Sequence, residues 1–278
     1  MDLVITGAAG FVGSHLARTL LARGSLGGAP IERLVLCDVA PPLAALSGDR
    51  RVEWRTGPLL AQCEELAADR FDGIFHLASA VSAECEADFD LGMRSNLETS
   101  RALLLALRAA GNVPRFVFAS SGAVFGGDPP YAPLPAVVRD DTLPTPQTSY
   151  GIQKFIIEQL IADFTRKGFI DGRAVRLLTV TVRPGRPNGA ASGFLSGIIR
   201  EPLAGVDTIC PVPPETLVAL CSPARTIAAL IAAYEASREA FGGRSALNLP
   251  ALTVRVREML DALEAFAGPS ASWRSWTG

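Results

Sequence analysis

A tyrosine and a lysine stand four residues apart in the segment Tyr150-Gly-Ile-Gln-Lys154. On a helix this spacing projects both side chains from one face, where the ammonium favours the phenolate form of the tyrosine. Lowering a tyrosine pKa from near 10 to about 7 takes roughly 4 kcal/mol, which requires a close cation together with the positive ring of an oxidised nicotinamide. Such a tyrosine can take a proton from an alcohol while the nicotinamide takes the hydride. Without further signals, the same pair is typical of any amphipathic helix surface.

A serine turn upstream supplies the next signal. The segment Ser120-Ser-Gly-Ala-Val-Phe-Gly126 follows a strand expected at residues 115–119. We predict that Ser121 hydrogen-bonds the substrate oxygen beside Tyr150 and holds it in line for reaction. Ser120 is the competing serine, which would otherwise point into the sheet or bond the turn. The sequence therefore predicts a catalytic set of Ser121, Tyr150 and Lys154.

A glycine trio near the start of the chain predicts where a dinucleotide would bind. Gly7, Gly10 and Gly13 lie between a strand expected at residues 3–6 and a helix expected at residues 14–23. A tight turn in this place needs glycine, and a diphosphate needs bare backbone near the start of the helix. The trio alone would also suit an ordinary turn between a strand and a helix, but its context favours a nicotinamide dinucleotide.

Asp38 directly follows the second expected strand, residues 34–37. A carboxylate in this position accepts hydrogen bonds from both adenosine ribose hydroxyls and repels a 2′-phosphate. Cys37 and Val39 flank it, so no arginine adjacent in sequence could accept that phosphate. NAD is therefore expected as the cofactor rather than NADP, with a solvated loop aspartate as the alternative reading of Asp38.

Strands and helices alternate through the first two thirds of the chain. Further strands are expected at residues 52–55, 73–77, 115–119 and 174–182, with helices at 97–110 and from about 150 to 167. This alternation predicts an α/β fold with a parallel sheet covered by helices on both faces. After residue 182 the elements become shorter. We expect a nucleotide-binding domain at residues 1–182 and a small C-terminal substrate lobe at 183–278, either separate from the first domain or interleaved with it.

Composition narrows the range of partners. The 278 residues carry a formal net charge of -2 with mixed signs, which does not suggest a nucleic-acid surface or a membrane patch. No apolar run reaches the roughly 18 residues of a spanning helix, and no signal peptide is expected. Five scattered cysteines and two histidines predict reduced thiols in a cytoplasmic protein, with no metal site.

The glycine loop, His76-Leu-Ala78, Asn96, the serine turn and the Tyr150/Lys154 pair together resemble the extended short-chain dehydrogenase/reductase superfamily. The resemblance covers nearly the whole chain. It implies a Rossmann-type doubly wound sheet with NAD lying across it, and a homodimer through the helices that carry Asn96 and Tyr150. The cofactor site it implies consists of Gly7, Gly10, Phe11, Val12, Gly13, Asp38, Leu59, Leu77, Ala78, Ser79, Asn96, Tyr150, Lys154 and Pro184. Pro58 departs from the pattern, because the superfamily often has an adenine-binding aspartate there.

Within the superfamily, the segments 83–93, 183–188, 196–203 and 246–250 resemble the D-erythronate dehydrogenases. This likeness implies oxidation of a short sugar acid at C2 to a 2-oxo acid. A carboxylate substrate needs a cation or several donors. The expected substrate-binding residues are Ser82, Ser121, Arg183, Asn188 and Arg200.

Two other functions stay open. A nucleotide-sugar 4-epimerase would typically carry an Arg-Asp-like motif where this chain has residues 217–223, Leu-Val-Ala-Leu-Cys-Ser-Pro. A non-catalytic dinucleotide-sensing protein would commonly lack the Tyr150/Lys154 pair. We therefore favour a dehydrogenase that acts on a small free acid.

Overall fold

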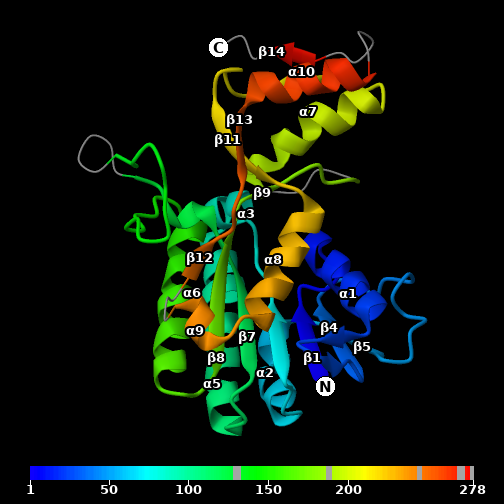
Figure 1. Ribbon diagram of the computed structural model, residues 1–278, viewed down its shortest axis with the longest axis vertical. Helices are drawn as coiled ribbons and strands as arrows, with labels where there is room; N and C mark the ends of the chain where they lie inside the picture. Colours follow the sequence, from blue (N-terminus) through cyan, green and yellow to red (C-terminus); the bar gives the residue numbers. More distant parts are fainter. Residues whose placement is uncertain (128–132, 186–189, 243–245, 268–272, 276–278) are drawn as a thin grey trace. The chain divides into compact units, whose positions relative to one another are not determined.

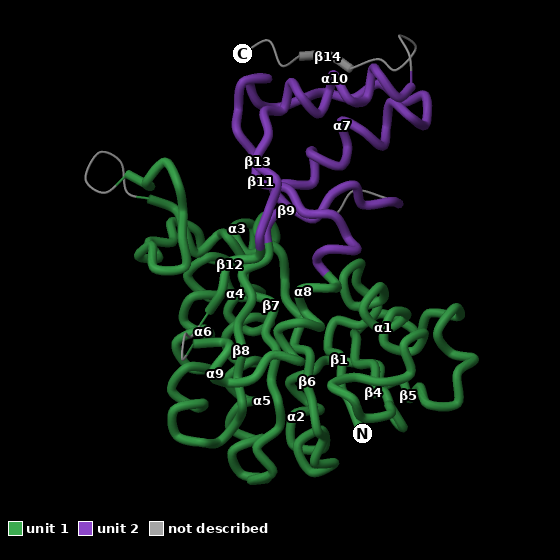
Figure 2. The backbone as a smooth tube through the Cα atoms, in the orientation of Figure 1, with its two compact units in different colours: residues 1–177, 227–249 green, residues 178–226, 250–278 purple. Residues whose placement is uncertain are grey.

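The computed structural model describes residues 1–127, 133–185, 190–242, 246–267 and 273–275, and the chain forms two compact units (Figure 2). Unit 1 consists of residues 1–177 and 227–249, and unit 2 of residues 178–226 and 250–278. The chain thus leaves unit 1 after Leu177, returns to it at Ile227 and leaves again after Leu249. A single cut at residue 182 does not describe this path.

Unit 1 is built on a seven-stranded sheet in which every pair of neighbours is parallel. Its order across the sheet is β12-β8-β7-β6-β1-β4-β5. This confirms the expected α/β fold with a Rossmann-type sheet. The strands are β1 (Asp2–Thr6), β4 (Arg33–Asp38), β5 (Val52–Thr56), β6 (Gly73–His76), β7 (Arg115–Ser121), β8 (Asp171–Leu177) and β12 (Ala246–Asn248).

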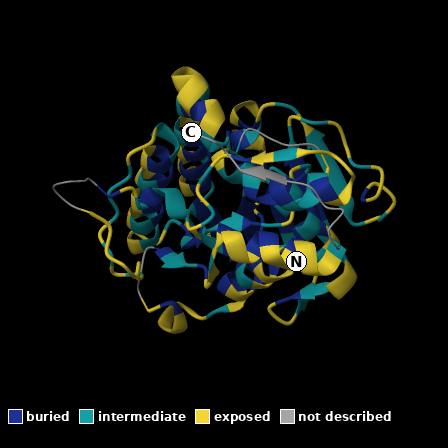
Figure 3. Cartoon of the chain, turned by 90° about the horizontal axis from the view of Figure 1, so that it is seen from above, coloured by how far each residue is buried: buried dark blue, intermediate teal, exposed yellow. Residues whose placement is uncertain are grey.

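Helices cover both faces of this sheet, as the alternating sequence predicted (Figure 1). On one face, α2 (Leu59–Ala68), α5 (Thr99–Ala110) and α6 (Ser149–Arg166) pack on side chains such as Ile74 and Phe116. On the other face lie α1 (Phe11–Arg23) and the later part of α8 (Pro223–Glu235), where Phe75 stacks on Tyr234 with ring centroids 5.4 Å apart. Because successive strand residues point to opposite faces, the side chains of Ile74 and Phe75 pack against different helical layers. The buried residues accordingly gather on the strands and on the inward sides of these helices (Figure 3).

Short elements link the layers of unit 1. A hairpin of β2 (Ser25–Leu26) and β3 (Ala29–Pro30) follows α1, and α3 (Ser82–Ala87) and α4 (Phe89–Gly92) follow β6. A 3-10 turn, η2 (Gly122–Val124), continues from β7, and α9 (Arg238–Phe241) lies between α8 and β12.

A π-helix, η1 (Met93–Glu98), replaces the first part of the α-helix expected at residues 97–110. The α-helical part, α5, begins only at Thr99. Two hydroxyls bond backbone carbonyls of this wider turn: Thr99 Oγ1 donates to Arg94 O at 2.7 Å, and Ser100 Oγ donates to Asn96 O at 2.5 Å. Hydropathy periodicity cannot reveal such a turn, because a π-helix of this length shifts the apolar face by only a fraction of a turn. Turns of this kind are frequent at functional sites.

The strand expected at residues 174–182 is wrong in its second half. β8 ends at Leu177, and Thr179–Val180 form a separate strand, β9, which pairs with β11 (Leu217–Cys221) of unit 2. Apolar character continues through both strands because each is paired within a sheet. The change of sheet therefore left no trace in the hydropathy pattern.

Unit 2 has its own small core. A three-stranded sheet of β9, β11 and β13 (Leu252–Arg255) accompanies α7 (Phe194–Leu203) and α10 (Val256–Ala267). Packing among α7, α10 and β11 buries Leu195, Ile198, Leu220, Val256 and Leu260. The unit also contains the 3-10 turn η3 (Ala191–Gly193) and the parallel pair β10 (Thr208–Cys210) and β14 (Trp273–Ser275).

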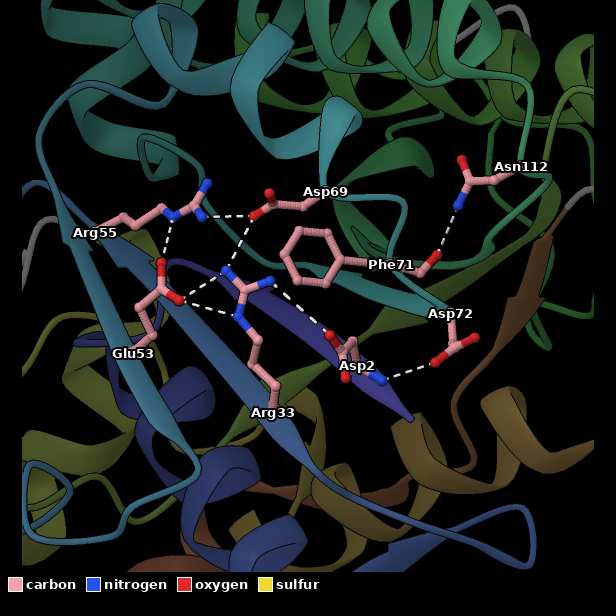
Figure 4. A network of polar contacts seen from close by, with 8 residues as sticks. All are labelled: Asp2, Arg33, Glu53, Arg55, Asp69, Phe71, Asp72 and Asn112. Carbon is pink, nitrogen blue, oxygen red and sulfur yellow. Dashed lines mark hydrogen bonds and ion pairs between the residues drawn. The ribbon is translucent and has the colours of Figure 1, made fainter.

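Charged side chains link β5, the outermost strand of the large sheet, to β4 and to the end of α2 (Figure 4). Arg33 on β4 bonds Glu53 on β5 at 2.7 Å, and Arg55 on β5 bonds both Glu53 at 2.8 Å and Asp69, just after α2, at 2.5 Å. Charges along an outer strand also discourage pairing with another chain. Among the described helices, none has the length and apolar character needed to cross a membrane.

Candidate cofactor and active site

Unit 1 contains a cavity of about 710 Å³ at the carboxyl ends of β1, β4 and β6. This is where the strand order reverses direction, and dinucleotides bind at such a point in open α/β sheets. The cavity is lined by residues of five segments: Gly7, Ala9, Gly10, Cys37, Asp38, Val39, Ala40, Gly57, Pro58, Leu59, Leu60, Leu77, Ala78, Ser79, Ala80, Glu84, Leu91, Arg94, Ser95 and Thr99.

The glycine loop forms a cradle that a side chain would fill. Gly7 has a φ of +71°, and a Cβ there would lie 2.8 Å from the backbone nitrogen of Ala78. A Cβ on Gly13 would lie 2.1 Å from the carbonyl oxygen of Gly7. Bare backbone therefore faces the cavity at the start of α1, where the helix dipole favours an anion. These features fit the diphosphate of a nicotinamide dinucleotide.

Asp38 lies at the end of β4 with both carboxylate oxygens facing backbone amides. Oδ2 accepts a hydrogen bond from Ala9 N at 2.8 Å, and Oδ1 accepts one from Ala40 N at 2.9 Å. The carboxylate is thus fixed at the cavity wall beside the glycine loop. A charge in this position suits an adenosine ribose and opposes a phosphate on it.

A chain of hydrogen bonds beneath the cavity connects β1, β6 and the π-helix. Ser100 Oγ already donates to Asn96 O, so it must accept the 2.8 Å bond from His76 Nε2. His76 Nδ1 then accepts from Thr6 Oγ1 at 2.8 Å, and Thr6 Oγ1 accepts from the amide of Ala78 at 3.2 Å. Burial, assisted by the charge of Lys154, lowers the pKa of His76 to about 3, so the imidazole stays neutral. His76 is therefore a structural link between β1, β6 and the start of α5.

Asn96 organises the backbone that follows β6. Its side-chain oxygen accepts from Ala80 N at 2.8 Å and from Ser79 Oγ at 3.0 Å, while Nδ2 donates to Gln153 Oε1 of α6 at 2.8 Å. This buried amide therefore ties the cavity wall to the helix that carries Tyr150 and Lys154.

Lys154 and Tyr150 lie on the inner face of α6, which begins at its N-cap Thr148. The Lys154 Nζ is 5.5 Å from the centre of the Tyr150 ring and donates to the carbonyl oxygen of Ala119 at 2.9 Å. It also lies 4.7 Å from the centre of the Phe118 ring. The lysine is only 3% exposed, and burial lowers its pKa to about 7, against the opposing influence of Cys85 and Glu158. The arrangement brings a cation close to a phenol, as base catalysis by a tyrosine requires.

The two serines at the end of β7 have different partners. Ser120 is buried, and its hydroxyl donates to Glu158 Oε1 at 2.5 Å. Ser121 is half-buried, and its Oγ accepts from Ala123 N at 3.1 Å in the turn η2. Ser120 is therefore engaged inside the structure, which leaves Ser121 as the serine at the strand end.

The remaining predicted residues are distributed over both units. Phe11, Val12 and Gly13 form the first turn of α1, and Ser82 begins α3. Arg183, Pro184 and Arg200 belong to unit 2, and Asn188 lies outside the described residues.

Arg200 has its own partners in unit 2. Its guanidinium donates to the carbonyl oxygen of Arg183 at 2.7 Å and pairs with the carboxylate of Glu201. The backbone of Arg183 is held further by its amide, which donates to Ser196 Oγ at 3.0 Å. Arg200 thus braces the segment that carries Arg183.

Several residues of the cavity wall were missed from the sequence. Glu84, Leu91, Arg94, Ser95 and Thr99 reach the wall from α3, α4, η1 and the start of α5. The segments that carry them were not expected to form the cavity. Asn96, which was predicted as a cofactor residue, was the sequence signal that pointed to this part of the wall, because Arg94 and Ser95 lie in the same π-helical turn.

Comparison with known proteins gives the family of the chain. Residues 3–216 match the model of the NAD dependent epimerase/dehydratase family. The chain is 50% identical to the D-erythronate dehydrogenase of Cupriavidus necator, over 99% of this chain and 84% of that protein. It is 41% identical to the D-erythronate dehydrogenase of Haemophilus influenzae, over 96% of this chain and 83% of that protein.

Among solved structures, the chain is similar to one described as the nucleoside-diphosphate-sugar epimerase from Agrobacterium tumefaciens. The TM-score is 0.93 at 43% identity, covering 100% of this chain and 82% of that one. With the glycine cradle, Asp38 and the dehydrogenase relatives, these findings identify a dehydrogenase that uses a nicotinamide dinucleotide. The chain belongs to the NAD dependent epimerase/dehydratase family.

Proposed function

We propose that this chain oxidises D-erythronate, or a closely related four-carbon sugar acid, at C2 to the 2-oxo acid with NAD as the oxidant. The observation that carries the proposal is the 50% identity to a D-erythronate dehydrogenase over 99% of the chain. The buried cation beside Tyr150 supports it, because it suits removal of a proton from a hydroxyl. NAD rather than NADP is proposed from the fixed carboxylate of Asp38.

Tyr150 acts as the base in this proposal. As the C2 hydroxyl becomes a carbonyl, its proton passes to the Tyr150 oxygen and its carbon-bound hydrogen leaves as hydride. NAD, when bound, supplies the hydride acceptor. Lys154 favours the phenolate through its charge, and it would also hold the nicotinamide ribose. Ser121 donates to the reacting oxygen and keeps it in line with Tyr150.

The cofactor would be held by the residues of the cavity. The glycine loop with Phe11 and Val12 would hold the diphosphate, Asp38 the adenosine ribose, and Leu59 with Leu77 to Ser79 the adenine side. Asn96 would act through the hydroxyl of Ser79 and the backbone amide of Ala80, both of which donate to its side-chain oxygen. Pro184 is proposed beside the nicotinamide.

The substrate carboxylate is proposed to bind Arg183, with Ser82 and Asn188 as neutral donors. Arg200 remains a candidate, but its bond to the Arg183 carbonyl supports a bracing role for it as well. A bidentate guanidinium is the side chain best suited to a carboxylate.

We further propose a homodimer through α5 and α6. These helices pack side by side (Figure 1), and their outer faces leave Leu105, Ile152 and Ile156 exposed. Apolar side chains on adjacent helices favour burial against a second copy. The five free, buried cysteines support the cytoplasm, a reducing compartment, as the location that we propose.

A nucleotide-sugar 4-epimerase is the second candidate, because the similar structure from Agrobacterium tumefaciens is described as a sugar epimerase. The two functions differ in their net reaction. A dehydrogenase accumulates NADH, whereas a 4-epimerase releases none and binds a uridine diphosphate. Both differ from a dinucleotide sensor, which would bind NAD without turning over any sugar.

The test is NADH formation by the purified protein with D-erythronate and related tetronates, each with NAD and with NADP. We expect NADH from D-erythronate, and we expect Tyr150→Phe to lower kcat by about 10² to 10⁴ while NAD affinity stays within a few-fold. Tyr234→Phe is the matched control. Tyr234 lies on α8 and packs on Phe75 of β6, so this variant should leave kcat unchanged. Full turnover by Tyr150→Phe, or absence of NADH with every sugar acid, would reject the proposal.

A further inference from the structure

A fully buried carboxylate lies one helical turn beyond the proposed catalytic lysine. Tyr150, Lys154 and Glu158 follow one another at four-residue spacing on α6, so they share one face of the helix. Glu158 is 0% exposed, although no step of the proposed reaction uses it. A buried charge needs partners, because its removal from water is costly.

Two side chains from neighbouring strands hold Glu158. Arg176 of β8 bonds it with both nitrogens of its fork, Nε to Oε1 at 2.9 Å and Nη2 to Oε2 at 2.8 Å. Ser120 of β7 donates to Oε1 at 2.5 Å. Arg176 is itself 4% exposed, and its guanidinium lies 4.8 Å from the centre of the Phe125 ring. The carboxylate is therefore fixed in one position and charged.

One strand, β7, bonds both Lys154 and Glu158 of α6. Consecutive residues of β7 bond them: the backbone carbonyl of Ala119 accepts from Lys154, and the side chain of Ser120 donates to Glu158. The negative charge consequently cannot move away from the lysine without breaking the contact between β7 and α6. The next residue of this strand is Ser121, the proposed substrate ligand.

The charges near Lys154 come from several elements. The titratable and charged groups that act on it or adjoin it are Tyr150 and Glu158 on α6, Cys85 on α3, neutral His76 on β6 and, through Glu158, Arg176 on β8. Burial disfavours the ammonium, and Glu158 works against that effect. Without the carboxylate, two cations would remain in one buried region, and each would disfavour the charge of the other.

We propose that Glu158 is a positioning residue whose buried charge keeps Lys154 protonated beside Tyr150. The proposal rests on the proposed role of Lys154 in the reaction, but its central claim concerns the charge of the lysine itself. That charge can be measured in the protein without substrate or cofactor. Failure of the proposed function and failure of this inference are therefore separable.

The composition of the chain makes the measurement simple. Lys154 and Lys167 are its two lysines, and Lys167 is exposed at the end of α6. Protein labelled with ¹³C at the lysine ε carbon should give two signals by NMR, and Lys167→Arg should remove one and assign the other. The Lys154 signal should titrate with a midpoint near pH 7, as its lowered pKa of about 7 requires.

In Glu158→Gln we expect the acid dissociation constant of Lys154 to rise about tenfold, so that the midpoint moves to lower pH. The alkaline limb of kcat/KM should move in the same direction. Glu158→Asp keeps the charge and should leave the constant within about threefold of the wild-type value. An unchanged Lys154 midpoint in folded Glu158→Gln would overturn the proposal.

Two further variants separate this effect from general loss of stability. The double variant Glu158→Gln with Arg176→Gln removes the buried guanidinium that Glu158→Gln alone leaves without its carboxylate. We therefore expect it to fold even where the single variant does not, and it should shift the Lys154 midpoint in the same direction by about threefold. Asp171→Asn breaks ion pairs to Arg115 and Arg173 at the opposite end of β8. It should lower the free energy of unfolding without moving the Lys154 midpoint. A Lys154 midpoint that is unmoved in the double variant, or moved equally in Asp171→Asn, would contradict the proposal.

Discussion

Asp38 does two things with one carboxylate. It accepts hydrogen bonds from Ala9 N, in the glycine loop, and from Ala40 N, just after β4. The first bond helps to shape the loop, and we propose that the charge itself discriminates between dinucleotides. A substitution that removes only the charge should therefore change cofactor choice more than it changes folding.

In Asp38→Asn we expect the ratio of kcat/KM for NAD to that for NADP to fall about tenfold or more, corresponding to at least roughly 1.4 kcal/mol of lost discrimination. The amide keeps one acceptor oxygen but does not repel a 2′-phosphate. Steady-state rates with each cofactor give the ratio. Asp163→Asn, at the exposed end of α6, is the matched control and should leave it unaltered. If Asp38→Asn keeps the wild-type ratio, Asp38 does not select the cofactor.

At the level of elements, the close approach of α6 to the turn η2 fixes the start of the helix that carries Tyr150 and Lys154, the proposed catalytic pair. Gly151 follows Tyr150 directly, and a Cβ at Gly151 would lie 2.2 Å from the carbonyl oxygen of Ala123. The missing side chain thus allows the first turn of α6 to touch the turn that begins at Ser121. We infer that this contact fixes the position of Tyr150 relative to Ser121.

Gly151→Ala should therefore force α6 away from η2. We expect kcat to fall by about 10²-fold, since an error near 1 Å in the position of a catalytic group has that effect. Gly197→Ala in α7 is the control, because a Cβ there has nothing nearer than 3.4 Å and alanine favours a helix. Steady-state assays give kcat for both variants, and thermal unfolding shows whether each is folded. Equal activity in the two would show that the contact at Gly151 does not position Tyr150.

Local spacing explains which parts were predictable. The strands of the large sheet, the glycine loop and the Tyr150/Lys154 pair depend on residues close together in sequence, so one-dimensional patterns indicate them. Partners such as Glu158 and Arg176, or His76 and Ser100, come from separate elements that meet only when the sheet is assembled. The transfer of the chain from β8 to β9, in a different sheet, also left the hydropathy pattern unchanged. Sequence therefore predicted the motifs but not the contacts that hold them.

At the scale of the whole molecule, the proposed dimer depends on the outer face of α6. Ile152 is 45% exposed and Ile156 is 39% exposed, one turn apart on the same helix that presents Tyr150 on its inner face. A stable dimer buries about 800 Å² per partner, which neighbouring α5 can help to supply. In such a dimer, α6 would be packed on its inner face by unit 1 and on its outer face by the second copy.

Ile152→Asp combined with Ile156→Asp should convert a dimer into a monomer, because two charges would have to be buried at the interface. Sedimentation velocity measures the mass in solution. Leu143→Asp changes an equally apolar and more exposed position in a loop of unit 1 and should leave the mass of the assembly unaltered. A monomeric wild-type protein, or a double variant that still sediments as a dimer, would exclude this interface.

β12 comes late in the sequence, after every other strand of its sheet, and this order has a consequence during translation. Residues 246–248 pair with the outer edge of β8, and Asn248 N bonds Asp140, yet they are translated after the whole first segment of unit 2. A nascent chain that has emerged only as far as α8 therefore presents the bare edge of β8, with its backbone donors and acceptors unsatisfied. Such an edge invites pairing with other chains. We therefore expect this edge to stay open to such pairing during translation until β12 has left the exit tunnel.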